Sequence, residues 1–298
     1  MIVKKFLEKY LLPVAMIIGI VFHEQLSTLS FVTPYLLSMM LFFTYCRISW
    51  NQIRLSRFHY ILLAIQYVGS VAIYLIIRPF SEIVAQATMI CVLTATATSA
   101  SVVTGMLGGN IANAATYTII SNLLVAFAAP LFLSIIGNSE GVPFTDLFWY
   151  IFRKVMPILI VPFVAALLLA KISPKAHLKV RSAQIVSFYL WAAALTIVLG
   201  NVTQFVIAQF DGSLKVELVI AAATLVLCLL QFVFGRKIGS RFNETIAGGQ
   251  SLGQKNTVLA IWLTQSYLNP LASLGPGLYV LWQNLVNSWQ IWKKNRNG

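Results

Sequence analysis

Apolar segments of about 20 residues recur along the whole chain, separated by short polar connections. A helix needs about 20 predominantly apolar residues to cross the hydrocarbon core of a bilayer. Hydrophobic residues make up 59% of the 298 residues and charged residues only 10%, which is more apolar surface than a water-soluble domain of this length needs. We therefore predict an all-α membrane protein without a separate soluble domain.

Ten membrane-spanning helices account for these segments. Their predicted bounds are 10–24, 27–46, 59–78, 83–107, 111–137, 147–171, 182–206, 216–235, 244–267 and 272–292. The first is interpreted as a membrane helix and not as a cleaved signal peptide, because no small-residue cleavage site follows it.

The charges support the count of ten. If the N-terminus lies in the cytoplasm, the inner connections and the two termini hold 16 of the 21 Lys and Arg residues. Cytoplasmic loops carry an excess of these residues, so we expect a multi-pass protein of the plasma membrane, in a bacterium the inner membrane, with both termini cytoplasmic. The net charge of +13 lies in short clusters between apolar runs, which favours contact with the lipid bilayer and argues against a nucleic-acid partner.

Lys255 is the most unusual residue. It follows Gly248, Gly249 and Gly253, and the segment that contains it ends at Thr257, immediately before the apolar run 258–263. An ammonium at membrane depth is costly and usually marks a functional site. The glycines and amides around it predict a helix that is interrupted inside the membrane, which is tolerated only where backbone is buried in protein or lines a cavity. This combination points to a transporter.

The fourth span carries a second segment rich in Gly and Asn, Gly105–Asn113, and Asn113 and Asn256 are 143 residues apart. The fourth and ninth spans run in opposite directions. The pattern predicts two inverted five-helix repeats, 1–146 and 147–298, with broken helices 4 and 9 that cross. Their half-helix ends would offer N–H and C=O groups to an anion and a cation. The alternative is that these small residues only let helices pack closely.

Three short motifs resemble those of the bile acid:sodium symporter superfamily. They are Gly108–Asn113 continued by Thr116-Tyr117, then Gly253–Thr257, and Leu281–Leu285. The resemblance implies a panel domain of helices one, two, six and seven, and a core domain of helices three to five and eight to ten. It also implies that helices four and nine unwind where they cross, with substrate bound beside the crossing.

The resemblance and the residue chemistry together give two sets of candidate site residues. The candidates for substrate binding are Asn113, Asn256, Thr116, Asn110 and Asn284. The candidates for an ion site, or for a cation that replaces the ion, are Lys255, Ser251, Gln66 and Gln250. For the amides and for Thr116, purely structural hydrogen bonds are the alternative.

The chain departs from the family pattern at the positions that would ligate sodium. Family hydroxyl positions hold Ala112, Ala126 and Pro130, the ninth-helix glutamate is Ser251, and its glutamine is Lys255. Sodium is a hard cation that needs several oxygen ligands, and an ammonium in one ligand position would repel it. We therefore do not expect the sodium sites of the family to be retained.

Lys255 has four interpretations. Its ammonium can take the place of a sodium ion by donating to the oxygens that would ligate the ion. It can instead pair with a carboxylate substrate, carry a coupling proton, or extend along its own stem to the inner surface.

We predict a secondary transporter that moves a small organic anion by alternating access, with reduced or absent sodium coupling. One alternative is a sodium symporter with ion sites rebuilt from Gln250, Ser251 and backbone carbonyls. Another is a non-transporting membrane receptor or structural subunit. The isolated Cys and His residues predict no metal or other cofactor, and the lack of paired carboxylates predicts no enzyme. The substrate and the oligomeric state stay open.

Overall fold

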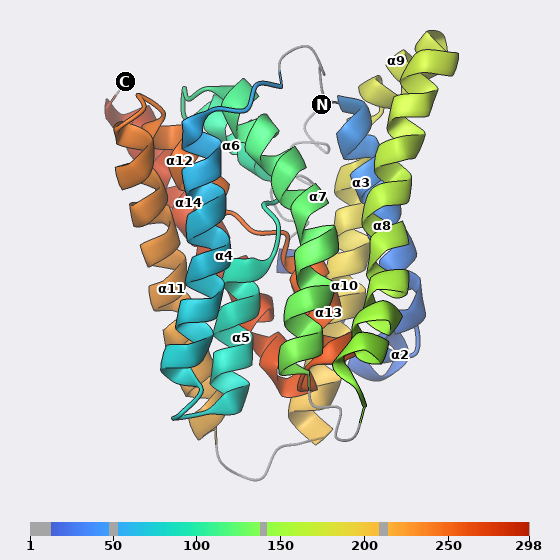
Figure 1. The fold of residues 1–298 in the computed structure, drawn as a ribbon, viewed down its shortest axis with the longest axis vertical. Coiled ribbons are helices and arrows are strands. Elements are labelled where there is room, and N and C mark those ends of the chain that lie inside the picture. The colour runs from blue at the N-terminus through green and yellow to red at the C-terminus, as the bar shows by residue number, and fades with distance from the viewer. Residues whose placement is uncertain (1–12, 48–52, 138–141, 209–213, 298) are drawn as a thin grey trace. The chain divides into compact units, whose positions relative to one another are not determined.

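The structure, a computed structural model, describes residues 13–47, 53–137, 142–208 and 214–297. This part of the chain is nearly all helical (Figure 1). The chain divides into two compact units, one of residues 1–48 and 153–212 and the other of residues 49–152 and 213–298. Each unit combines segments from both halves of the sequence, and the division follows the panel and core groups that the resemblance implies.

The first unit contains residues 13–21, which are helical, and several further helices. These are α2 (His23–Ser27), η1 (Ser30–Val32), α3 (Thr33–Arg47), α8 (Phe144–Ile172) from Arg153 onward, α9 (Pro174–Ser182) and α10 (Gln184–Ala208). Two glycines allow close packing within it. A Cβ atom at Gly19 would lie 2.8 Å from the carbonyl oxygen of Thr196, and one at Gly200 would lie 2.8 Å from Cβ of Leu26. The N-terminal helices therefore pack directly on α10.

The second unit holds the remaining helices. These are α4 (Arg57–Ile77), α5 (Glu82–Leu93), α6 (Ser99–Met106), α7 (Ile111–Ile136), α11 (Lys215–Ser240), α12 (Thr245–Gly253), α13 (Thr257–Tyr267), η3 (Pro270–Ser273) and α14 (Leu274–Asn297). A buried apolar cluster that includes Phe58, Leu62, Tyr117 and Leu252 joins α4, α7 and α12. Segments from both halves of the sequence thus share one core.

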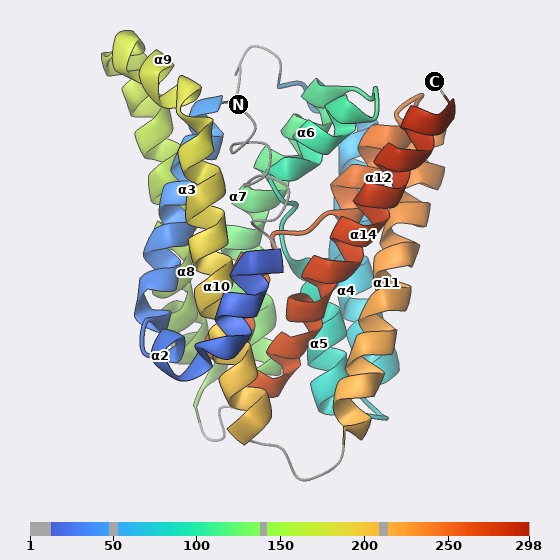
Figure 2. The same cartoon turned by 180° about the vertical axis from the view of Figure 1, so that it is seen from behind.

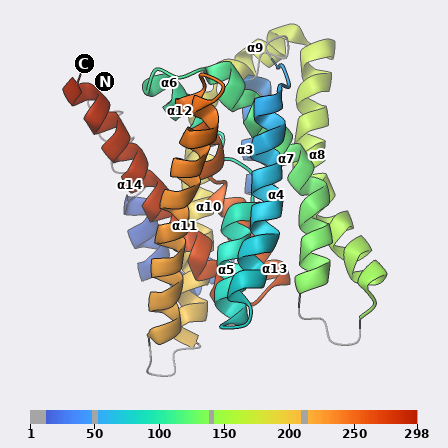
Figure 3. The same cartoon turned by 60° about the vertical axis from the view of Figure 1, so that its left-hand side comes forward.

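Glycines bring α11 and α12 into backbone contact, and Figure 3 shows the two helices side by side. A Cβ atom at Gly235 would collide with the backbone carbonyl of Gly248, and one at Gly248 would collide with the carbonyl of Gly235. Small residues let helices approach this closely in membrane proteins. The pair fixes α12, and with it the segment that contains Lys255, against α11.

Five helices of the described chain are long and apolar enough to cross a membrane. They are α4, α7, α8, α10 from Ile185 onward, and α11. Their bounds lie within five residues of predicted spans. The predicted spans 83–107 and 244–267 each correspond to two helices, α5 with α6 and α12 with α13. The short helix α9 was not predicted, because it contains no apolar run, although proline near its start and basic residues in its last turn are helix signals.

The prediction placed the interruption of the fourth span at Gly105–Asn113, and this location is wrong. The chain leaves helical geometry earlier, between Leu93 and Ser99, and residues 107–110 connect two separate helices, α6 and α7. Gly108 has a φ of 84°, a conformation that suits a residue without Cβ. The side chain of Asn110 caps α7 by accepting two backbone N–H groups at 3.1 and 3.3 Å. Glycine and asparagine therefore mark a turn between helices here.

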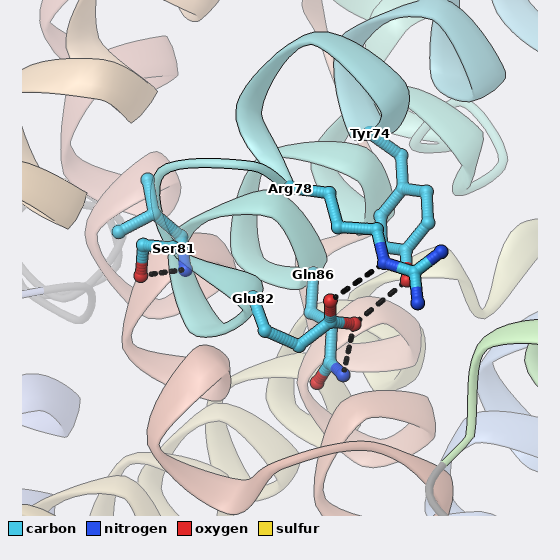
Figure 4. Close-up of polar contacts among 6 residues, drawn as sticks. Tyr74, Arg78, Ser81, Glu82 and Gln86 are labelled. Atoms are coloured by element: carbon cyan, nitrogen blue, oxygen red, sulfur yellow. Dashed lines mark hydrogen bonds and ion pairs between the residues drawn. The ribbon is translucent and has the colours of Figure 1, made fainter.

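Glu82, the first residue of α5, connects α5 to the end of α4 (Figure 4). Its carboxylate accepts hydrogen bonds from the hydroxyl of Tyr74 at 2.7 Å and the amide of Gln86 at 3.1 Å, and pairs with Arg78 at 3.2 Å. The side-chain oxygen of Gln86 in turn accepts the backbone N–H of Asn269, between α13 and η3, at 2.9 Å. A carboxylate at a helix N-terminus is favoured by the helix dipole, so this contact set fixes the start of α5.

Candidate functional site

Two non-helical segments of the second unit pair with each other. One connects α5 to α6 and the other connects α12 to α13, and Figures 1 and 2 show the two connections meeting. The backbone N–H of Asn256 donates to the carbonyl of Ala95 at 2.8 Å, and that of Ala97 donates to the carbonyl of Gln254 at 3.0 Å. Thr96 and Lys255 thus form an antiparallel bridge. We call residues 94–98 and 254–256 the crossing.

Lys255 lies at the centre of the crossing with only 1% of its surface exposed. Its ammonium donates to the carbonyl oxygens of Val92 at 2.8 Å and Thr94 at 3.3 Å. These carbonyls stand at the C-terminal end of α5, where backbone acceptors lack helical partners and the dipole favours a cation. The interpretation in which Lys255 extends to the inner surface is therefore wrong.

Thr96 makes the matching contact in the opposite direction. Its hydroxyl donates to the carbonyl of Ser251, near the end of α12, at 2.6 Å. Position 255 is 159 residues after position 96, and position 251 is 159 residues after position 92. Each segment thus sends one side chain to the equivalent carbonyl of the other, and the donor is neutral in one case and cationic in the other.

Gln66 of α4 binds the same helix end as Lys255. Its amide nitrogen donates to the carbonyls of Leu93 at 2.7 Å and Thr94 at 3.2 Å, and its side-chain oxygen accepts the hydroxyl of Tyr117 at 2.6 Å. The carbonyl of Thr94 therefore receives donors from both predicted residues, Gln66 and Lys255. The structure brings these two candidates together.

Side chains of α14 hold the other segment. The backbone N–H of Lys255 donates to Oε1 of Gln283 at 2.8 Å, and Nε2 of Gln283 donates back to the carbonyl of Lys255 at 3.3 Å. The hydroxyl of Tyr279 donates to the carbonyl of Gly253 at 2.9 Å. Buried backbone groups need such partners where helical hydrogen bonding stops. The predicted residue Asn284 instead donates to Val280 of its own helix at 2.6 Å.

The two helices that begin at the crossing differ in how their N-termini are satisfied. Asn256 caps α13 by accepting the backbone N–H of Leu259 at 3.3 Å, as predicted for a half-helix cap. No side chain caps the N-terminus of α6, where Ser99 is exposed and accepts the amide of Gln254 at 2.5 Å. The side-chain oxygen of Gln254, a residue only 4% exposed, has no partner among the described residues. The start of α6 is therefore the accessible edge of the crossing.

Asn110 and Asn113 lie away from the crossing, at the start of α7. Their amides both donate to Oε1 of Glu244, at 2.9 and 2.5 Å respectively. Glu244 immediately precedes the nine-residue helix α12, about 14 Å along the axis from its end. These two predicted substrate ligands therefore fasten α7 to α12.

Three further candidates are buried and carry side-chain oxygens without a partner among the described residues: Thr116, Ser251 and Gln250. Gln250 also donates to the side chain of Asn287 at 3.1 Å. Thr116 belongs to α7, and the other two belong to α12.

Sequence reasoning missed four residues of the site: Thr96, Ser99, Gln254 and Gln283. One signal could have located Thr96. Hydroxyl residues occupy every second position of Thr94-Ala95-Thr96-Ala97-Thr98, and a period of two is typical of extended backbone.

The buried charge inside the second unit is positive, with no buried carboxylate among the described residues. Lys255 is the one charged residue among the buried residues of the described chain, and its contacts are neutral carbonyls. Two helix N-termini, of α6 and α13, also face the crossing with positive dipole ends. Carbonyl oxygens that would suit a cation are occupied by the ammonium, while the accessible edge suits an anion.

The model of the SBF-like CPA transporter family, which is related to the bile acid:sodium symporters, matches residues 47–281. This range contains the whole crossing and all the predicted site residues except Asn284. No curated protein matches the chain at a significant level.

Proposed function

Because the chain belongs to the SBF-like CPA transporter family, we propose that it carries a small organic anion across the membrane by alternating access, with little or no coupling to sodium. The observation that carries the proposal is the ammonium of Lys255 on the carbonyls of Val92 and Thr94. An ammonium and a sodium ion compete for the same oxygen ligands, so a built-in ammonium leaves no need for the ion at this point.

The proposed architecture keeps ten membrane spans in two inverted repeats, 1–146 and 147–298, with both termini in the cytoplasm. In this arrangement α5 with α6 forms the fourth span and α12 with α13 forms the ninth. The matched contacts of Thr96 and Lys255, 159 residues apart, support the repeat better than the correspondence of Asn113 with Asn256 that the sequence suggested. Unwound backbone at membrane depth is tolerated because it is buried within the second unit.

Labelling of introduced cysteines tests this topology. Phe80, between α4 and α5, is 87% exposed and lies at the proposed outer face, whereas Lys237, near the end of α11, lies at the proposed inner face. A cysteine at position 80 should react with an impermeant maleimide in intact cells, and one at position 237 only after permeabilisation. The native cysteines Cys46, Cys91 and Cys228 are buried and give little background. External labelling at position 237 would refute the ten-span topology.

The proposed substrate site is the accessible start of α6. Backbone N–H groups at a helix start without a side-chain cap suit a carboxylate or a similar anionic group. The unpartnered oxygen of Gln254 suits a hydroxyl or amide donor on the same molecule. Asn256 and the N-terminus of α13 border this edge through the crossing. An organic anion with a neighbouring hydroxyl or amide group is the substrate class that fits.

A thermal-shift screen of the purified protein against such anions tests the site. A binding anion raises the unfolding midpoint with increasing concentration. Gln254→Leu should weaken binding at least about tenfold, since one lost hydrogen bond to a charged or polar ligand group is worth about 1.5 kcal/mol. The control is Thr104→Val, more than one turn into α6, whose hydroxyl donates to the carbonyl of Ala100 in its own helix at 2.7 Å. Equal losses in both variants would place the substrate elsewhere.

A sodium symporter with rebuilt ion sites is the second candidate. The buried, unpartnered oxygens of Gln250 and Ser251 favour it, because both lie on α12 one turn before Lys255. A hard cation needs several oxygen ligands, and these two side chains supply only part of such a set. The candidate predicts a sodium-dependent rise in stability that Gln250→Leu removes.

A further inference from the structure

The C-terminal half of α14 carries two opposite stripes. The inward stripe consists of Gln283, Asn287 and Gln290, which are 5%, 5% and 8% exposed and bond to the rest of the second unit. Residues four and seven positions apart share a helix face. The outward stripe has the same spacing and consists of Leu285, Trp289, Trp292 and Arg296. Its Leu and Trp residues are between 55% and 61% exposed.

The outward stripe changes character along the helix. It begins with an aliphatic side chain, continues with two tryptophans and ends with cations. Lys293 lies over the ring of Trp289 at 5.1 Å, and the guanidinium of Arg296 lies over the ring of Trp292 at 5.4 Å. Tryptophan is enriched at the membrane interface, and basic residues beyond it meet the headgroups. The stripe from Leu285 to Arg296 spans about 16 Å, about half of a hydrocarbon core of about 30 Å.

Further positive charge lies at the same end of the second unit. Arg236, near the C-terminal end of α11, donates to Gln290 at 2.9 Å, which places this part of α11 beside α14. Lys237, the next residue, and Arg241, the C-cap of α11, are exposed. The one acidic residue of the adjoining α12 start, Glu244, already accepts two asparagine amides. The exposed basic side chains at this end, which include Lys237, Arg241, Lys293 and Arg296, therefore outnumber the single carboxylate.

We propose that this stripe binds an anionic phospholipid. Its phosphate would lie between Lys293 and Arg296, with Lys237 and Arg241 adding to the field, and its acyl chains would lie along Leu285, Trp289 and Trp292. The aliphatic, aromatic and cationic order matches the order of groups in one lipid leaflet. The lipid site is independent of the substrate site. A lipid bound there would contact α14, the helix whose Gln283 bonds to Lys255, so the position of α14 would depend on the lipid composition.

Lipid titration followed by native mass spectrometry of the full-length protein tests the proposal. Phosphatidylglycerol should bind more tightly than phosphatidylcholine with the same acyl chains. Lys293→Gln with Arg296→Gln should lower the affinity for phosphatidylglycerol about 25-fold, because each basic residue near an anionic lipid contributes about a factor of five. It should leave phosphatidylcholine binding unchanged, and Lys293→Arg with Arg296→Lys should retain the preference.

The matched control is Arg153→Gln with Lys215→Gln, which removes two exposed positive charges elsewhere. It should leave the lipid preference intact. Three results would overturn the proposal: equal binding of both lipids by the wild type, equal losses in the test and control variants, or displacement of the lipid by millimolar inorganic phosphate. Cross-linking from position 289 to a second copy of the chain would also overturn it, since the stripe would then be a protein interface.

Discussion

Replacing Lys255 by Met is expected to lower the free energy of unfolding by about 2–3 kcal/mol. Met keeps most of the apolar stem but deletes two hydrogen bonds from a charged donor, each typically worth about 1.5–3 kcal/mol. Removal of the buried charge offsets part of this loss, because its desolvation cost disappears as well. The carbonyl of Val92 loses its ammonium partner, and the N–H of Thr96, one turn later, already donates to Ser121. Unfolding in mixed micelles measures the difference.

Lys294→Met is the matched control. Lys294 also donates to a backbone carbonyl at a helix end, that of Met106 at 2.9 Å, but its side chain is exposed. Surface substitutions usually change stability by about 0.5 kcal/mol or less. If Lys255→Met is as mild as Lys294→Met, the ammonium of Lys255 is not integral to the crossing.

Gly248→Ala is expected to have the largest effect, a loss of about 3 kcal/mol or failure to fold. Its new Cβ would collide with the backbone carbonyl of Gly235 in α11. Overpacking costs about 1–3 kcal/mol where side chains can move, and here the obstacle is backbone. The displaced helix α12 leads directly into the crossing. Gly235→Ala should behave alike, because the collision is reciprocal.

Gly69→Ala is expected to change stability in the opposite direction. A Cβ atom at Gly69, inside α4, would lie 3.7 Å from Cγ1 of Val92, an ordinary contact. Alanine is favoured over glycine in a helix by about 0.5–1 kcal/mol, so this variant should be neutral or more stable. Thermal unfolding of the three variants checks the contrast, and an equally destabilised Gly69→Ala would show that the protein resists any added methyl group.

The five long apolar helices and the cap at Asn256 could be predicted from the sequence, and the reasons are specific. The apolar runs located the long helices because membrane helices must be apolar around most of their circumference. Lys255 was located because a single charge in an apolar run has few explanations. Asn256 was placed correctly as a cap, since Asn is favoured at N-caps and the apolar run begins two residues later, at Val258.

The interruption between α5 and α6 was missed because it lacks the residues that break helices on their own. Thr94–Thr98 contains no Gly, Pro or Asn, and its non-helical form depends on pairing with residues 254–256, which are distant in sequence. Conversely, Gly108 and Asn110 were assigned to the interruption because a helix-to-helix turn uses the same residues. Asn284 was chosen over Gln283 because a motif does not reveal which side of α14 faces the crossing.

The claim that Lys255 replaces a bound cation is tested most directly by the sodium dependence of thermal stability. The purified wild type should unfold at the same midpoint in sodium chloride and in choline chloride of equal concentration, with and without a bound anion. A ligand that binds the folded state raises stability with the logarithm of its concentration once the site is nearly saturated. The account would be contradicted if the midpoint of the wild type rose steadily with sodium concentration and Lys255→Met left this sodium dependence unchanged.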